Sequence, residues 1–185
     1  MSLYSDILAL FNIAPPSPYI NPAQVAATNW SNTLTPYVRP SVFASYIATL
    51  GQSIPNGNTP ITVNFDTKAY DTANAVTTGA SWVFTAPNTG YYRVTSIILY
   101  DAQVFTALNV LRLGLAVNGT TTNKPVLSRQ PVMVTSTFDF CLNGSATVFL
   151  NAGDTVSVWT YHGESAARTL IANAYSSQIF IEQVG

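Results

Sequence analysis

The sequence predicts an all-β domain, an antiparallel sandwich, preceded by an N-terminal arm of short helices. Three observations support this prediction. From Ile61 onward apolar residues alternate with polar ones, Gly-, Asn- and Pro-containing turns separate the apolar runs, and no amphipathic helical pattern lies between them. Seven or eight short strands with this punctuation are typical of an antiparallel sandwich.

Residues 1–54 follow a different pattern and are expected to form three short helices. The first carries Leu3, Ile7, Leu10 and Phe11, which are the candidate anchoring residues of the arm. The second begins at Asn21-Pro22, a favoured helix start. The third, "SVFASYIATLG" (41–51), has apolar residues at helical spacing and a glycine at its end, with the apolar positions at Phe43, Tyr46, Ile47 and Leu50.

Short apolar helices cannot bury their faces alone, so the arm either packs on the following domain or docks into another protein. The Gly-, Pro- and Asn-rich segment 51–60 marks the boundary between them. We therefore expect an arm at 1–54 and a head domain at 55–185.

The head domain is expected to contain strands in this order: 61–66, 81–86, 89–100, 110–117, 138–142, 146–150, 155–161 and 176–184. Asn143-Gly144 is a strong hairpin signal between two of them. Some strands, such as "SWVFTA" and "SSQIFIEQ", are apolar on both faces. One face is then expected to pack inside the sandwich and the other on a neighbouring subunit.

The charge content is unusually low. Charged residues make up 8% of the chain, against roughly 25% in an average soluble domain, and the net charge is −1. This disfavours nucleic acid as a partner, and no apolar run is long enough for membrane insertion. Cys141 is the only cysteine, which excludes an intrachain disulfide and suggests a small buried side chain.

The segment 146–164 combines the only histidine, His162, with Asp154 and Glu164. If 155–161 is a strand, Asp154 and His162 lie roughly 27 Å apart, too far for one catalytic site. Asp154 is instead expected to accept backbone N–H groups in its turn.

Two interpretations of the following loop stay open. Tyr161, His162, Glu164 and Arg168 form either a ligand-contact loop or a solvated loop in which Arg168 pairs with Glu164. Two candidate ligands do not make a metal site, so we expect no metal or cofactor.

An enzyme is not expected. The sequence contains no G-x-S-x-G elbow, phosphate-binding glycine loop or C-x-x-C pair. A sugar-processing enzyme would need two carboxylates about 5 to 10 Å apart. Asp139 and Glu182 are the only acids on predicted strands that could form such a pair.

Four motifs, in order, resemble the globular head of complement C1q, a jelly roll related to tumour necrosis factor (TNF). They are "NTGYYRVTSIIL" (88–99), "LRLGLAVNG" (111–119), "VFLNAGDTVSVWT" (148–160) and "SSQIFIEQVG" (176–185). Here Asn88 replaces the usual proline, and the arm replaces a collagen-like stalk. The resemblance implies a jelly roll, a homotrimer and a non-enzymatic binding head.

These observations together predict a virion structural protein, such as a phage head fibre, decoration protein or tail-fibre head. Its arm is expected to dock on a capsid or tail protein, and its head to bind a host-surface glycan or protein. The start of the chain lacks the features of a signal peptide, which fits synthesis in the host cytoplasm. The alternative is a bacterial surface or spore-coat adhesin head of the same fold.

Overall fold

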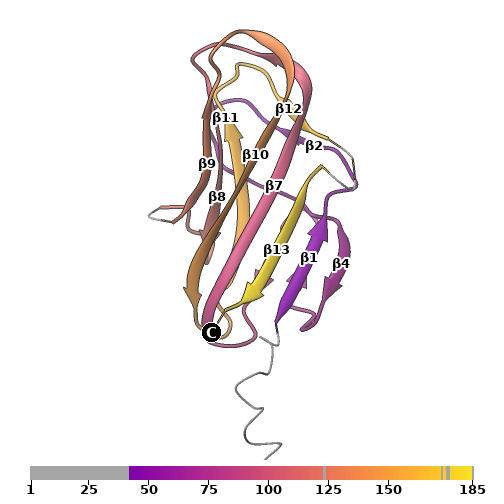
Figure 1. The fold of residues 1–185 in the computed structure, drawn as a ribbon, viewed down its shortest axis with the longest axis vertical. Helices are drawn as coiled ribbons and strands as arrows, with labels where there is room; N and C mark the ends of the chain where they lie inside the picture. The colour runs from indigo at the N-terminus through magenta and orange to yellow at the C-terminus, as the bar shows by residue number, and fades with distance from the viewer. Residues whose placement is uncertain (1–41, 123, 172, 174–175, 185) are drawn as a thin grey trace, which may run out of the picture. The chain divides into compact units, whose positions relative to one another are not determined.

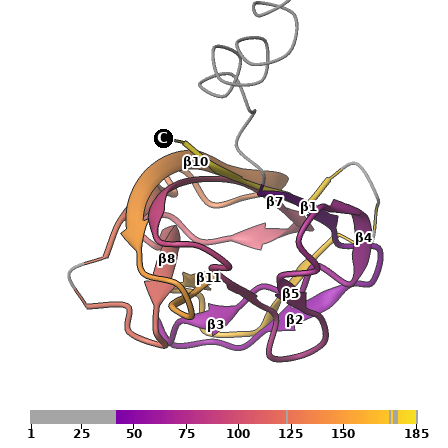
Figure 2. The same cartoon turned by 90° about the horizontal axis from the view of Figure 1, so that it is seen from below.

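The computed structural model describes residues 42–122, 124–171, 173 and 176–184. In this part of the chain, two antiparallel sheets pack face to face (Figures 1 and 2). The seven-stranded sheet has the order β2-β12-β7-β13-β1-β4, and its seventh strand, β10, also pairs with β7. Its strands are β1 (Phe43–Ile47), β2 (Gln52–Ile54), β4 (Thr67–Asp71), β7 (Gly90–Phe105), β10 (Ser136–Leu150), β12 (Arg168–Leu170) and β13 (Gln178–Gln183).

The six-stranded sheet lies opposite and has the order β5-β6-β11-β8-β9, with β3 also paired to β11. Its strands in the described residues are β3 (Ile61–Thr62), β5 (Val76–Thr77), β6 (Val83–Thr85), β8 (Val110–Val117), β9 (Val126–Pro131) and β11 (Thr155–His162). The predicted all-β sandwich is therefore confirmed. The short strands β4, β5, β9 and β12 were not anticipated from the sequence.

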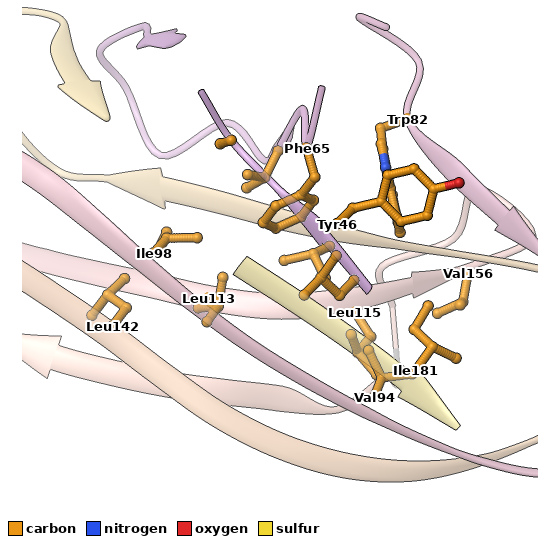
Figure 3. Close-up of a cluster of buried hydrophobic side chains, with 14 of the residues drawn as sticks. Tyr46, Phe65, Trp82, Val94, Ile98, Leu113, Leu115, Leu142, Val156 and Ile181 are labelled. Carbon is orange, nitrogen blue, oxygen red and sulfur yellow. The ribbon is translucent and has the colours of Figure 1, made fainter. Parts of the chain in front are cut away.

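The core fills the space between the two sheets (Figure 3). Alternate residues of β7 and β8 point inward, and Leu111, Leu113 and Leu115 are fully buried, as their spacing predicted. Trp82 closes one side, with its ring edge-to-face against Tyr46 at 6.0 Å and other aromatic contacts nearby. Burying a large apolar side chain contributes about 1.5 to 3 kcal/mol, so this core is the main source of stability.

The helix predicted at 41–51 is wrong, because Phe43–Ile47 forms β1 and β2 follows at Gln52–Ile54. β1 pairs with β13 and β4, with Phe43 opposite Glu182. Ala44 and Tyr46 point into the core, and Ser45 is buried on the other side of the strand. Burial on both faces removes the polar alternation that identifies a strand in sequence.

The boundary expected after residue 54 is corrected as well. The unit that holds the sheets spans Pro40–Gly185, and β2 pairs with β12 through Ile54 and Arg168. The predicted anchoring residues Leu3, Ile7, Leu10 and Phe11 lie outside the described residues.

The hairpin turn predicted at Asn143-Gly144 is also wrong, because both residues lie inside the long strand β10, which pairs with β7 along its length. Instead of forming a turn, Gly144 allows β10 to pack closely against β9. A Cβ atom at this position would collide with the backbone carbonyl of Leu127 on β9. Cys141, on the same strand, is exposed rather than buried.

The Asn118-Gly119 pair does form a turn. Both residues have positive φ angles, 50° and 72°, as the mirror-image hairpin turn requires. Val117 and Thr120 exchange two backbone hydrogen bonds of 3.0 Å across it. The motif resemblance for 111–119 therefore corresponds to a strand followed by a tight turn.

Candidate functional site

The outward face of the seven-stranded sheet is the largest functional candidate. Residues 92, 94, 96, 98 and 100 of β7 point into the core, so the odd-numbered residues of this strand point outward. The strands β4, β1, β13, β7 and β10 run side by side across Figure 1. Their outward rows carry five exposed large apolar side chains: Tyr70 (47% exposed), Tyr91 (54%), Ile97 (37%), Phe149 (53%) and Phe180 (38%).

These side chains pair across strands. Tyr91 lies opposite Phe149, with ring centroids 5.2 Å apart in an edge-to-face arrangement. Phe180 lies opposite Thr95, whose hydroxyl is hydrogen-bonded to Ser145 at 2.8 Å. The surface is thus already ordered before any partner binds, which lowers the entropic cost of association.

Charge on this face is neutralised locally. Arg93 and Glu182 lie opposite each other on β7 and β13 and form an ion pair. A hollow of about 150 Å³ lies beside this pair, lined also by Phe43, Tyr70 and Phe180. An apolar sheet face with one self-compensated ion pair has the composition of a subunit interface.

The segment 162–168, which the sequence indicated, contains a buried polar cluster of His162, Glu164 and Arg168, whereas residues 165–167 are exposed. His162 is fully buried. Its Nδ1 accepts the Glu164 N–H at 3.2 Å, so Nε2 carries the proton and donates it to the Ile54 carbonyl at 3.0 Å. Burial lowers the pKa of His162, opposed in part by the bond to Ile54. The neutral ring is therefore the form that fits this site.

Glu164 and Arg168 form a buried ion pair of 3.1 Å, as the sequence suggested they could. Glu164 Oε1 accepts the Thr106 N–H at 2.9 Å, and Arg168 Nη2 donates to the Val104 carbonyl at 2.6 Å. Burial raises the pKa of Glu164, but hydrogen bonds from Thr106 and Asn109 and the Arg168 charge outweigh it and leave the pKa below its usual value.

These contacts decide between the two sequence interpretations of the loop only in part. The solvated loop is wrong for Glu164 and His162, which are 1% and 0% exposed. Residues 165–167 are exposed, and the Glu164–Arg168 pair forms. Ligand contact by Tyr161, His162, Glu164 and Arg168 stays a prediction, in which the half-buried Tyr161 is the member facing out of the sandwich.

Asp154 lies in the turn before β11, at the opposite end of the strand from His162. It accepts the Asn151 N–H at 2.8 Å, so its predicted turn role is confirmed. The apparent cluster of Asp154, His162 and Glu164 is therefore divided between two ends of one strand.

The two strand-borne acids are separated too. Glu182 lies opposite Arg93, whereas Asp139 precedes Phe140, which lies opposite Tyr100. Seven residues along β7 correspond to roughly 23 Å, too long for paired carboxylates. Among the residues the structure describes, no group of three His, Cys, Asp or Glu side chains could hold a metal ion, and no helix is long and apolar enough to cross a membrane.

No protein-family model matches the sequence, and no curated protein matches it significantly. Solved structures do match. Eiger TNF from S. frugiperda superposes with a TM-score of 0.55 at 17% identity, over 80% of this chain and 94% of that one. The globular domain of zebrafish complement 1qA protein gives 0.54 at 14% identity, over 78% and 98% of the two chains. Murine APRIL at pH 5.0 gives 0.52 at 13% identity, over 77% and 98%.

Identities this low establish the fold and leave function to be argued from the site. The matches nevertheless cover nearly the whole of each compared domain. The chain therefore has the jelly-roll fold shared by TNF-like and C1q-like globular domains, which the order of its sequence motifs predicted.

Proposed function

We propose that this chain is a structural binding head that assembles as a homotrimer through the outward face of the seven-stranded sheet. The observation that carries the proposal is the row of exposed apolar side chains on that face, among them Tyr91, Phe149 and Phe180. An exposed patch of this kind marks an interaction site in a folded protein. The trimeric state follows the C1q-like resemblance of the sequence and the fold that matches it.

The low charge of the chain supports the same proposal. With 8% charged residues, repulsion between copies is weak, and the single ion pair of the face, Arg93 with Glu182, is already compensated within one subunit. Burying the part of this face around Tyr91, Phe149 and Phe180 therefore requires no unpaired charge of this ion pair to leave water.

Within this proposal the head is a component of a virion appendage, held by the N-terminal segment on a capsid or tail protein and directed at a host surface. Both ends of the described domain leave from one end of the sandwich, because Gln183 donates a 3.0 Å hydrogen bond to the Val42 carbonyl. Attachment at that end leaves the opposite end of the sandwich free for binding.

Substitution on the exposed face tests the assembly. Phe149→Asp and Phe180→Asp each place a carboxylate on the proposed interface and should convert the trimer to monomers that keep a β-type circular dichroism spectrum. Leu108→Asp is the matched control, because Leu108 is 91% exposed in a loop away from this face. Unchanged mass in both phenylalanine variants would refute the interface.

Deletion tests the attachment. Removal of residues 1–39 stops before the unit that begins at Pro40, so the shortened chain should fold and remain trimeric. It should no longer co-purify with the parent particle. A shortened head that still attaches to the particle would refute the anchoring role of Leu3, Ile7, Leu10 and Phe11.

A further inference from the structure

A row of charge crosses the outward face of the six-stranded sheet. Arg112 on β8 lies opposite Tyr161 of β11 on one side and opposite Arg129 of β9 on the other. Like charges directly opposite in a sheet are destabilising. The chain has only seven Lys and Arg residues, so the placement of two of them side by side requires an explanation.

Neither arginine has an acidic partner within the described part of the chain. The Arg112 Nε atom is buried and makes no hydrogen bond, and no ion pair involves Arg112 or Arg129 among these residues. The other described cations have a polar neighbour each, as shown by Lys68 with Asn74, Arg93 with Glu182, Lys124 near Asp154 and Arg168 with Glu164. A bound anion would supply the acidic partner that both guanidinium groups lack.

An ordered aromatic pair supports the row. The Arg112 guanidinium lies over the Tyr161 ring, 5.5 Å from its centroid. Tyr161 in turn is stacked on Trp159, with centroids 5.6 Å apart and planes 8° apart. Trp159 is fixed by a 2.9 Å hydrogen bond from its indole Nε1 to the Leu115 carbonyl, and its ring lies over Gly114. The Arg112 guanidinium is thus held in position before any ligand binds.

We propose that Arg112, Arg129 and Tyr161 bind an acidic saccharide, a sugar whose ring carries a carboxylate. Two guanidinium groups side by side can hold one carboxylate through paired hydrogen bonds. The half-buried Tyr161 ring offers an apolar surface to the sugar ring.

The surrounding backbone favours a sugar over an extended acidic peptide. β8 and β11 are interior strands, hydrogen-bonded on both sides, whereas β9 is the last strand of the sheet order. Arg112 and Tyr161 are therefore reached through side chains alone, which suits a compact ring. A peptide that adds itself to a sheet would pair with the edge strand β9 instead, two strands away from Tyr161.

The position of Arg112, Arg129 and Tyr161 fits the binding role proposed above. This inference rests on that proposed role. The row lies near the start of β8 and the end of β11. The ends of the described domain lie at the other end, because Val184 bonds to Tyr91 and the Asp154 turn bonds to Thr89 there. All three binding residues come from one chain, so the test does not depend on the trimer.

The test is an NMR titration of the full-length chain with methyl β-glucuronide, following the indole N–H of Trp159. Methyl β-glucoside, which carries a neutral hydroxymethyl group in place of the carboxylate, is the matched ligand. The glucuronide should bind, with an affinity that falls as salt rises, and the glucoside should bind at least about tenfold more weakly. Arg129→Gln should weaken glucuronide binding about tenfold or more, whereas the charge-matched control Lys68→Gln should leave it unchanged.

Three results would overturn the proposal. One is equal binding of both glycosides, or binding of neither. Another is an equal loss of affinity in Arg129→Gln and Lys68→Gln. The third is tighter binding of a short glutamate peptide than of the glucuronide, which would assign the row to acidic peptides. A monomeric chain that binds the glucuronide would refute the trimer and keep this site, so the two proposals fail separately.

Discussion

The guanidinium of Arg168 lies 3.1 Å from the carboxylate of Glu164, and both side chains are almost fully buried beneath the end of β7. Each also bonds the backbone of β7 or of the residue after it, at Val104 and Thr106. The pair thus joins the loop after β11 to the end of the longest strand.

Glu164→Ala should lower the free energy of unfolding by about 3 to 5 kcal/mol, because it leaves the Arg168 charge buried without its partner. Denaturant unfolding at fixed protein concentration measures this, since an oligomer's stability depends on concentration. Asp139→Ala is the control, because it removes an exposed carboxylate and should change stability by less than about 0.5 kcal/mol. Equal losses in the two variants would show that the Glu164 pair has no special role.

Acid should weaken the fold through Glu164. Its pKa is lower in the folded state than its ordinary value of 4.5, so its contribution is complete above about pH 4.5 and is lost as pH falls through the lower folded pKa. Unfolding free energies measured across this range should fall more steeply for the native chain than for Glu164→Gln. Parallel curves would contradict this assignment.

His162 should act in a separate, higher pH window. Burial lowers its pKa below the ordinary 6.5, so its contribution is complete above pH 6.5 and declines as pH falls below that value. His162 is the only histidine, so NMR of the untagged protein reports its titration without ambiguity. The expected result is a pKa below 6.5 with the proton on Nε2; a pKa at or above 6.5 would be inconsistent with the burial of the ring and with the Glu164 N–H bond to Nδ1.

Gly114→Ala should cost about 1 to 3 kcal/mol by overpacking, because the new Cβ collides with the ring of Trp159. A double-mutant cycle isolates the cause. In a Trp159→Ala background the same substitution should cost almost nothing. If the cost persists without the ring, the backbone rather than Trp159 requires glycine at this position.

Much of the sandwich could be predicted from the sequence, because many strands have one face that is buried and one face that is exposed to solvent. The Leu111, Leu113 and Leu115 ladder shows this alternation, and it is buried as expected. β1 was missed because Ala44, Ser45 and Tyr46 are all buried, which left an accidental helical spacing. Gly144 was read as a turn because its close approach to Leu127 is a tertiary contact with no local signal.

Of the candidate sites too, one was indicated by the sequence and another depends on tertiary contacts that the sequence does not show. Two-sided apolar strands pointed correctly to an uncovered face, which the structure shows at Phe180 and its neighbours. The arginine row could not be found, because Arg112 and Arg129 are brought opposite each other only by the register of β8 and β9. The His162 loop was read as surface because local polarity cannot reveal that later packing buries it.

The mass of the full-length chain in solution, measured by sedimentation or light scattering over a range of concentrations, tests the proposed trimer. A trimer has a mass of three times 19.9 kDa, and this mass should fall to that of the monomer in Phe149→Asp and Phe180→Asp. A stable monomer of the unmodified chain across that range would contradict the proposed trimer.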